Sequence, residues 1–173
     1  MRFKILGLMA AVTLVAACET GPEGGAGASG AGVAGAKPVE TFSTPLGMTV
    51  KAGSQEDLVV NVGDRVFFGF DKFNLKADAR KTLEKQAAWM KANPSVTVTV
   101  EGHADERGTR EYNLALGERR ANSVKDYLAA LGVNPSRMKT ISYGKERPVA
   151  SGSNEAAWGQ NRRGVTKVTG AGS

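Results

Sequence analysis

The stretch that decides the fold is SVTVTVEGHADERGTREYNLALGERRANSVKDYLAALG, residues 95–132. Its first part, 95–102, alternates valine with threonine or glutamate, which is the period-two pattern of a strand with one buried face. Thr109 is a good helix N-cap, and the apolar positions after it recur with helical spacing until Gly132 supplies a stop. The sequence therefore predicts a strand, a loop and then a long helix over 109–131.

The same two periods recur on both sides of this stretch. Strands alternating with two long helices are typical of an α/β two-layer sandwich, so we expect a mixed sheet of about four strands packed on two long helices. The predicted domain spans residues 46–170. Within it the patterns indicate strands over 64–70, 137–144 and 164–169, a helix over 76–93 with Pro94 just past its end, and a short helix or loop over 154–163.

The N-terminus has the features of an exported lipoprotein. Residues 1–17 start with basic Arg2 and Lys4 and continue as a thirteen-residue apolar run. This run is shorter than the ~20 residues that span a membrane, so it predicts a signal peptide. Cys18 is the single cysteine, and VAAC resembles a bacterial lipobox, which predicts that Cys18 is lipidated and anchors the chain to a membrane. The alternative is an ordinary signal peptide with a stray cysteine.

Residues 18–45 carry the lipidated cysteine and then a different kind of sequence. Glycine, alanine, serine and proline dominate and no periodicity is present, which predicts a flexible tether. The tether contains GAGVAG, residues 30–35, but a dinucleotide site needs a strand before this motif and a helix after it. We therefore reject that interpretation.

The charge balance excludes one class of partner. Without the signal peptide the chain has 21 basic and 17 acidic residues, interspersed and without an aromatic stacking pattern. This mildly basic composition does not indicate nucleic-acid binding.

Two arginines on the predicted long helix differ in direction. At 3.6 residues per turn, Arg120 lies about 40° from Leu116, inside the apolar stripe, whereas Arg119 falls in the polar sector. A guanidinium that faces a core needs a partner, and Asp105 lies on the preceding loop. The two could form an internal salt bridge. Alternatively, they could form a site for a zwitterion, in which aspartate binds an ammonium and arginine a carboxylate.

The chain resembles the OmpA-like domain family, and within it the peptidoglycan-associated lipoproteins. The resemblance covers about residues 66–168 and is carried by FDKFNL, VTVEGHADERGTREYNLALGERRANSVKDYL, SYGKERP and NEAAWGQNRR. It implies noncovalent binding of peptidoglycan through the meso-diaminopimelate of its stem peptide. It also implies that the protein lies on the periplasmic face of the outer membrane, and Glu19, the residue after the cysteine, favours the same membrane. Finally, it implies partnership with TolB in the Tol-Pal system.

The resemblance also implies the binding residues. The family's binding aspartate falls on Asp105 and its arginine on Arg120. The remaining contacts fall on Phe70, Asp71, Thr109 and Leu116. The chain departs from the family pattern at Gly69, where many relatives have an acid, and at Arg110, where many have proline.

The side chains of the same loop suggest two other functions. A metal site from His103, Asp105 and Glu106 would have a single histidine, whereas zinc sites usually use more nitrogen or sulfur ligands. A wall hydrolase could use Asp105, Glu106 and Glu111, but nearby arginine lowers a carboxylate pKa instead of raising it. We expect neither, and no cofactor.

Six further residues have mainly structural interpretations. Trp89 and Met90 are expected in or near the core, Arg162 and Arg163 are expected to brace the domain through ion pairs, and Tyr112 and Asn113 could shape the entrance of the site.

Overall fold

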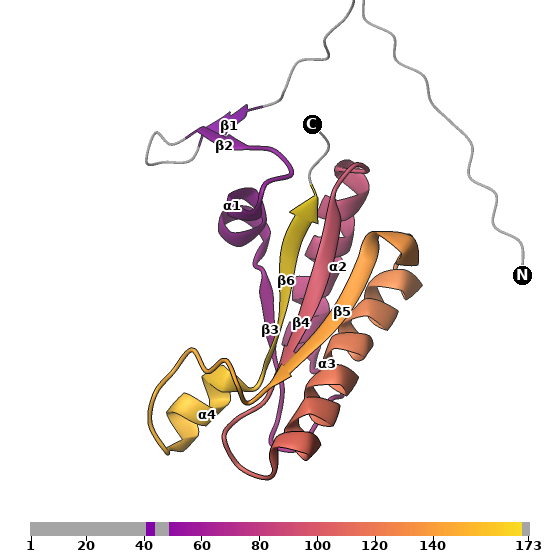
Figure 1. The fold of residues 1–173 in the computed structure, drawn as a ribbon. Helices are drawn as coiled ribbons and strands as arrows, with labels where there is room; N and C mark the ends of the chain where they lie inside the picture. Colours follow the sequence, from indigo (N-terminus) through magenta and orange to yellow (C-terminus); the bar gives the residue numbers. More distant parts are fainter. Residues whose placement is uncertain (1–40, 44–48, 171–173) are drawn as a thin grey trace, which may run out of the picture. The chain divides into compact units, whose positions relative to one another are not determined.

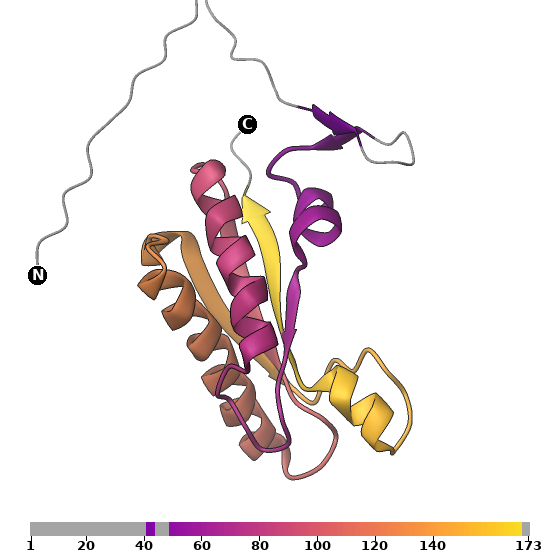
Figure 2. The same cartoon turned by 180° about the vertical axis from the view of Figure 1, so that it is seen from behind.

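A four-stranded sheet forms the centre of the fold. The structure, a computed structural model, describes residues 41–43 and 49–170. Two long helices, α2 (Ala77–Ala92) and α3 (Arg110–Ala130), cover one face of the sheet (Figures 1 and 2). The predicted α/β sandwich is confirmed. The strands are β3 (Arg65–Phe67), β4 (Thr97–His103), β5 (Met138–Gly144) and β6 (Arg163–Gly170).

The strand order is β3-β6-β4-β5. Strands β4 and β5 are parallel and are joined through α3, whereas β6 is antiparallel to both of its neighbours. The last strand of the chain therefore lies inside the sheet, between β3 and β4. The short helix α4 (Glu155–Asn161) precedes it.

The hydrophobic core lies between the sheet and the two helices. On β4, Val98 and Val100 point into it, as the alternating pattern predicts. Helix α2 contributes Met90, which is fully buried, and Trp89, which is 9% exposed. The core positions expected for these two residues are confirmed.

Strand β4 and helix α3 approach each other closely at two glycines. A Cβ added to Gly102 would lie 1.8 Å from the carbonyl oxygen of Gly117, and one added to Gly117 would lie 2.3 Å from Ser142 Oγ. Only glycine fits at such a contact. The contact fixes α3 against the sheet, one residue before β4 ends at His103 and the loop to α3 begins.

Ordered elements before β3 were not predicted. Strands β1 (Thr41–Ser43) and β2 (Thr49–Lys51) pair antiparallel, and a short helix α1 (Gln55–Asp57) continues into a π-helical turn over Leu58–Val62. The buried Asp57 accepts hydrogen bonds from Trp89 Nε1 at 2.7 Å and from Gly53 N at 2.9 Å. The bond from Trp89 joins the segment to α2, a contact that no local sequence pattern signals.

Several predicted boundaries differ from those in the structure. Strand β3 is shorter than the predicted 64–70, and β1 lies inside the range 18–45 assigned to the tether. The signal peptide, Cys18 and the rest of the tether lie outside the described residues. Within the described part of the chain, none of the helices has the length and hydrophobicity needed to cross a membrane.

Candidate functional site

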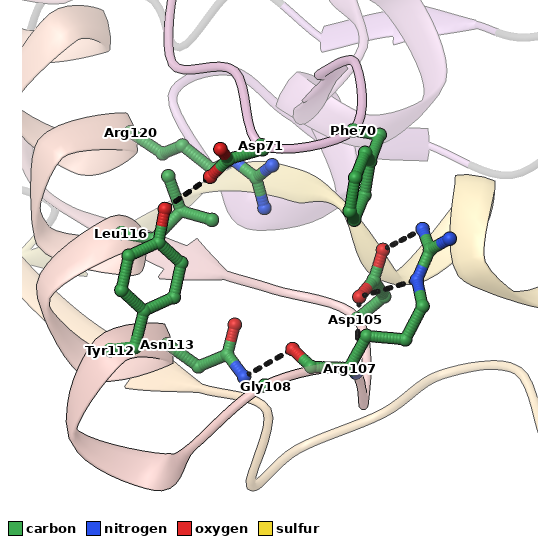
Figure 3. Close-up of a pocket in the computed structure, with 9 residues that line it drawn as sticks. All are labelled: Phe70, Asp71, Asp105, Arg107, Gly108, Tyr112, Asn113, Leu116 and Arg120. Carbon is green, nitrogen blue, oxygen red and sulfur yellow. Dashed lines mark hydrogen bonds and ion pairs between the residues drawn. The ribbon is translucent and has the colours of Figure 1, made fainter.

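A pocket of about 230 Å³ opens where the loop after β4 meets the loop after β3 and the first turns of α3 (Figure 3). Both signs of charge line it, together with aromatic and aliphatic groups. The lining residues are Phe70, Asp71, Asp105, Arg107, Gly108, Tyr112, Asn113, Leu116 and Arg120.

The structure brings five of the six predicted ligand-binding residues to this pocket. The sixth, Thr109, does not line it, because its hydroxyl caps α3 by accepting a hydrogen bond from Tyr112 N at 3.2 Å. Tyr112 and Asn113, which could shape the entrance of the site, also line the pocket.

Arg120 is fully buried and faces the sheet, as the helical wheel predicts. Each of its three nitrogens donates to a backbone carbonyl: Nε to Lys72 O at 2.9 Å, Nη1 to His103 O at 2.7 Å, and Nη2 to Gly69 O at 3.0 Å. Burial lowers the pKa of Arg120 to about 10, and the nearby Asp105 partly offsets this effect. The side chain therefore remains a cation at neutral pH.

Asp105 is also buried, but it pairs with other arginines (Figure 3). It accepts hydrogen bonds from Arg107 Nη2 at 2.6 Å and from Arg162 Nη1 at 3.2 Å. Burial alone would raise the pKa of Asp105, but these two arginines outweigh it and hold the pKa below its ordinary value. The possible Asp105–Arg120 salt bridge is not formed, because backbone carbonyls occupy Arg120 and two other guanidinium groups occupy Asp105.

Arg107 is the main residue that the sequence interpretation missed. Its guanidinium lies between two aromatic rings, 4.1 Å from the centroid of Phe70 and 4.0 Å from that of Trp158. Such stacking is a favourable cation–π arrangement. The sequence feature that could have identified Arg107 is its position two residues after Asp105. On a tight loop this spacing allows Arg107 N and Nε to donate to Asp105 Oδ1.

Asp71 lies across the pocket from Asp105 (Figure 3). Its φ is +53°, the left-handed region in which aspartate is one of the tolerated residues. Tyr112 Oη donates to Asp71, and this bond raises the pKa of Tyr112. The loop after β3 and helix α3 are therefore linked across the pocket by an exposed polar contact.

The two departures from the family pattern lie beside the pocket lining. The carbonyl oxygen of Gly69 accepts a hydrogen bond from Arg120 Nη2. A Cβ there would meet the flexible side chains of Lys72, at 3.3 Å, and Lys76, at 3.9 Å, so a larger residue needs only a small shift. Arg110 begins α3 and lies 3.4 Å from Glu146 in an exposed ion pair.

The residues weighed for a metal site do not converge. The ring of His103 faces the opposite side of the sheet, whereas Asp105 lines the pocket and Glu106 accepts from Trp158 Nε1 at 2.9 Å. Over residues 41–43 and 49–170, no group of three or more His, Cys, Asp or Glu side chains is placed to hold a metal ion.

Two of the three carboxylates considered for a hydrolase, Asp105 and Glu106, are not suited to act as its acid. A general acid needs a raised carboxylate pKa, but hydrogen bonds from Ser153 and Trp158 lower that of Glu106, and arginines lower that of Asp105.

The two arginines at the junction of α4 and β6, Arg162 and Arg163, differ. Arg162 braces the domain as predicted, because its guanidinium pairs with Asp105 and with Glu155. For Arg163 the prediction was wrong: it donates to Asn161 O and Arg147 O and has no ion pair within the described part of the chain. The carbonyls of Asn161, at the end of α4, and of Arg147, in the loop after β5, lie closer to it than any carboxylate of the described residues.

Comparison with known proteins identifies the family. The OmpA family matches residues 67–162, more than half of the chain. The chain belongs to the OmpA family. It is 54% identical over 146 residues to the peptidoglycan-associated lipoprotein of Agrobacterium fabrum, covering 82% of each chain. It is 53% identical over 145 residues to that of Brucella melitensis, covering 82% of this chain and 86% of the relative.

A solved structure agrees with the OmpA assignment. The crystal structure of the peptidoglycan-associated lipoprotein from Burkholderia pseudomallei superposes with a TM-score of 0.60 at 42% identity, covering 61% of this chain and 90% of that chain. The resemblance predicted from the sequence is confirmed. Every residue that lines the pocket falls within the OmpA match.

Proposed function

We propose that this chain is a lipid-anchored protein of the outer membrane, on its periplasmic face, that binds peptidoglycan noncovalently through the meso-diaminopimelate of the stem peptide. The observation that carries the proposal is a single pocket with a buried arginine and a buried aspartate on its walls, in an OmpA-family domain. Diaminopimelate carries an ammonium and a carboxylate on one carbon, and a pocket with both charges suits such a zwitterion. The relatives are named peptidoglycan-associated lipoproteins, which supports peptidoglycan as the polymer that is bound.

Arg120 is proposed to bind the carboxylate. A guanidinium has five N–H donors, and three of those on Arg120 are engaged by carbonyls. One N–H remains on each terminal nitrogen, which is the set that binds a carboxylate through two parallel bonds. The carbonyl contacts hold the guanidinium in place, so little side-chain entropy is lost on binding.

Asp105 is proposed to bind the ammonium. A carboxylate accepts about four hydrogen bonds, and in the free protein Arg107 and Arg162 supply four. The ammonium therefore replaces Arg107, whose side chain is 32% exposed, whereas Arg162 stays as the buried counter-charge. Asp71 adds a second acceptor, while Phe70 and Leu116 contact the aliphatic part of the ligand. Thr109 contributes by capping α3.

The remaining parts of the chain fit a link between membrane and wall. Cys18 is proposed to carry the lipid, and residues 19–45 supply slack between the anchor and the domain. We propose TolB and the other Tol-Pal components as partners, in envelope integrity and cell division. The role needs binding and release without bond cleavage, so the domain is proposed to be a binding module and not an enzyme.

The test is calorimetry with a diaminopimelate-containing muropeptide, with a lysine-containing muropeptide as ligand control. Asp105→Asn and Arg120→Lys keep the size or the charge of the side chain but remove the paired geometry. Each is expected to weaken binding by at least about tenfold, because charged hydrogen bonds are lost. Asp126→Asn and Arg119→Lys make the same chemical changes at exposed positions of α3 and should bind like wild type.

Two results would contradict the assignment. One is wild-type affinity in a folded Asp105→Asn or Arg120→Lys variant, with folding checked by circular dichroism. The other is equal affinity for the two muropeptides, since lysine lacks the second carboxylate and its carbon-bound ammonium.

A further inference from the structure

A second pocket, of about 220 Å³, lies on the face of the sheet that α2 and α3 leave uncovered. Figure 1 looks toward this face, and the loop between β5 and α4 runs beside its lower end. The polar side chains that line it are Arg65, Glu101, His103, Arg147, Arg163 and Lys167. None of them belongs to the proposed peptidoglycan pocket.

The strand register explains why these side chains gather. Across the sheet, Arg65 pairs with Val165, and Val165 pairs with Glu101, so the three share one row. Side chains two positions apart on a strand share a face, which brings Arg163 and Lys167 of β6 to the same side as Val165. His103 follows from Glu101 in the same way.

The charges in this second pocket do not balance. Asp64 holds Arg65 through bonds of 2.8 and 3.1 Å. By contrast, Arg147, Arg163 and Lys167 have no carboxylate within 4 Å in the described part of the chain, and Glu101 is the single acid that lines the pocket. The pocket therefore has a surplus of two positive charges.

Two of these side chains are buried with unused polar atoms. Arg163 is 4% exposed and its Nε has no hydrogen-bond partner, although its terminal nitrogens donate to carbonyls. His103 is 2% exposed, and neither ring nitrogen has a partner, since Glu101 lies 3.6 Å away. Unsatisfied buried donors are rare in proteins and call for an explanation such as a ligand.

We propose that this pocket binds a phosphate monoester group. At neutral pH such a group carries a charge of about −1.5 to −2 and three acceptor oxygens, which matches both the surplus charge and the unused donors. Arg163 Nε, Lys167 Nζ and a ring N–H of His103 are the donors. Arg147, whose guanidinium carbon lies 3.7 Å from the centroid of the Tyr143 ring, adds a further cation to the lining.

A phosphate monoester could be a soluble compound or the headgroup of a membrane lipid. The chemistry that the pocket recognises is the same, and two probes separate the sources. Inorganic phosphate tests the soluble form, and phosphatidylcholine vesicles with or without phosphatidic acid test the lipid form.

His103 provides the readout, because it is the single histidine of the chain. Its imidazole resonances are followed by NMR in the full chain during titration with phosphate or with vesicles. Its pKa is lowered to about 4 by burial and then by Arg163, Arg147 and Lys167. A bound dianion offsets these three charges, so phosphate is expected to raise the pKa of His103 by about one unit or more, whereas acetate at equal ionic strength should have little effect.

Two variants and one control make the test specific. Lys167→Gln and Arg163→Gln are each expected to weaken phosphate binding at least about tenfold, because each removes a charged hydrogen bond. Lys139→Gln makes the same change on the same sheet face, since Lys139 pairs with Thr99, and it lies outside the pocket lining. It should bind like wild type. The exposed Lys167 keeps the test valid if Arg163→Gln fails to fold.

The outcomes are distinct. A shift of the His103 resonances with inorganic phosphate, or with phosphatidic acid vesicles alone, supports the soluble or the lipid source respectively. No shift with either probe, equal shifts with acetate, or equal weakening in Lys139→Gln would overturn the proposal. None of these results depends on muropeptide binding, so the two proposals fail separately.

Discussion

The two pockets each contain a buried arginine, but they compensate its charge differently. In the first, every nitrogen of Arg120 donates to a backbone carbonyl, and Asp71 and Asp105 add negative charge to the walls. In the second, Arg163 keeps an Nε without a partner among the described residues, and of the three further cations only Arg65 is paired with a carboxylate there. A buried guanidinium alone therefore does not define a ligand. The charges around it do, and they suit a zwitterion in one pocket and a dianion in the other.

His103 joins the two pockets. Its carbonyl oxygen accepts from Arg120 on the helix side, and its ring lines the pocket on the open side. The effects of substituting Arg120 and Arg163 should thus be separable, although His103 joins the two pockets.

The largest expected effect comes from Arg120→Ala. Three buried carbonyls would lose their donor, so the free energy of unfolding should fall by about 3 kcal/mol. Arg163→Ala frees two carbonyl contacts and removes a poorly paired charge, so about 1 kcal/mol is expected. Urea denaturation measures both, with Arg119→Ala as the exposed control within about 0.5 kcal/mol. An equal loss in the two buried variants would remove the contrast drawn here.

Gly102→Ala is expected to cost about 2–3 kcal/mol, because the new Cβ collides with the backbone of Gly117 and forces α3 away from β4. The first pocket lies on that helix, so muropeptide affinity should fall as well. Gly159→Ala is the control, since its Cβ would meet only Arg162 Nη2 at 3.7 Å within α4. Thermal unfolding of the two variants compares them, and similar melting temperatures would speak against the tight contact.

The next largest effect is expected in the pH dependence of stability, in which His103 and Asp105 should contribute over different pH ranges. The folded pKa of His103 is about 4, below the ordinary 6.5, so between these values the unfolded chain binds more protons. Stability is therefore lost as the pH falls through this window, by about 2 kcal/mol from pH 7 to pH 5. Asp105, whose pKa is also lowered, contributes stability that is lost only at more acidic pH, below its ordinary value of 3.8.

Urea denaturation at pH 7, 6 and 5 tests this window. The variant His103→Gln should lack the pH 5–7 component and keep the acid component of Asp105. If the variant retains the full wild-type slope between pH 7 and 5, another group is responsible.

The smallest effect is expected for Tyr112→Phe. Tyr112 is 45% exposed, and its bond to Asp71 is made at the surface, so the free energy of unfolding should change by less than about 1 kcal/mol. The same urea measurements check this. A larger loss would mean that the contact across the first pocket holds the loop after β3 in place.

The sequence predicted the elements that local patterns define. Helix α3 begins after the Thr109 cap and ends at Ala130, close to the predicted 109–131, and the alternating valines form β4 as expected. The direction of Arg120 followed from helical periodicity alone. These predictions succeed because hydrophobic periodicity, helix caps and terminating glycines depend only on residues close together in the sequence.

The partners of the charged side chains could not be predicted in the same way. Asp105 pairs with Arg162, which lies 57 residues away, and this pairing depends on how α4 packs at the end of the sheet. Arg120 binds carbonyls, which every residue has and no pattern marks. The position of β6 between β3 and β4 likewise follows from tertiary packing, so the second pocket could not be predicted from the sequence.

The central position of β6 also bears on how the chain reaches its fold. Its register joins Arg65 to Val165, about a hundred residues later in the chain, and such distant pairings form slowly because a long loop must close first. Until residues 163–170 arrive, β3 has no partner and β4 has one open edge. Unpaired edges are the places where strands join other molecules. A chain made from its N-terminus therefore remains prone to aggregation until its last strand is complete.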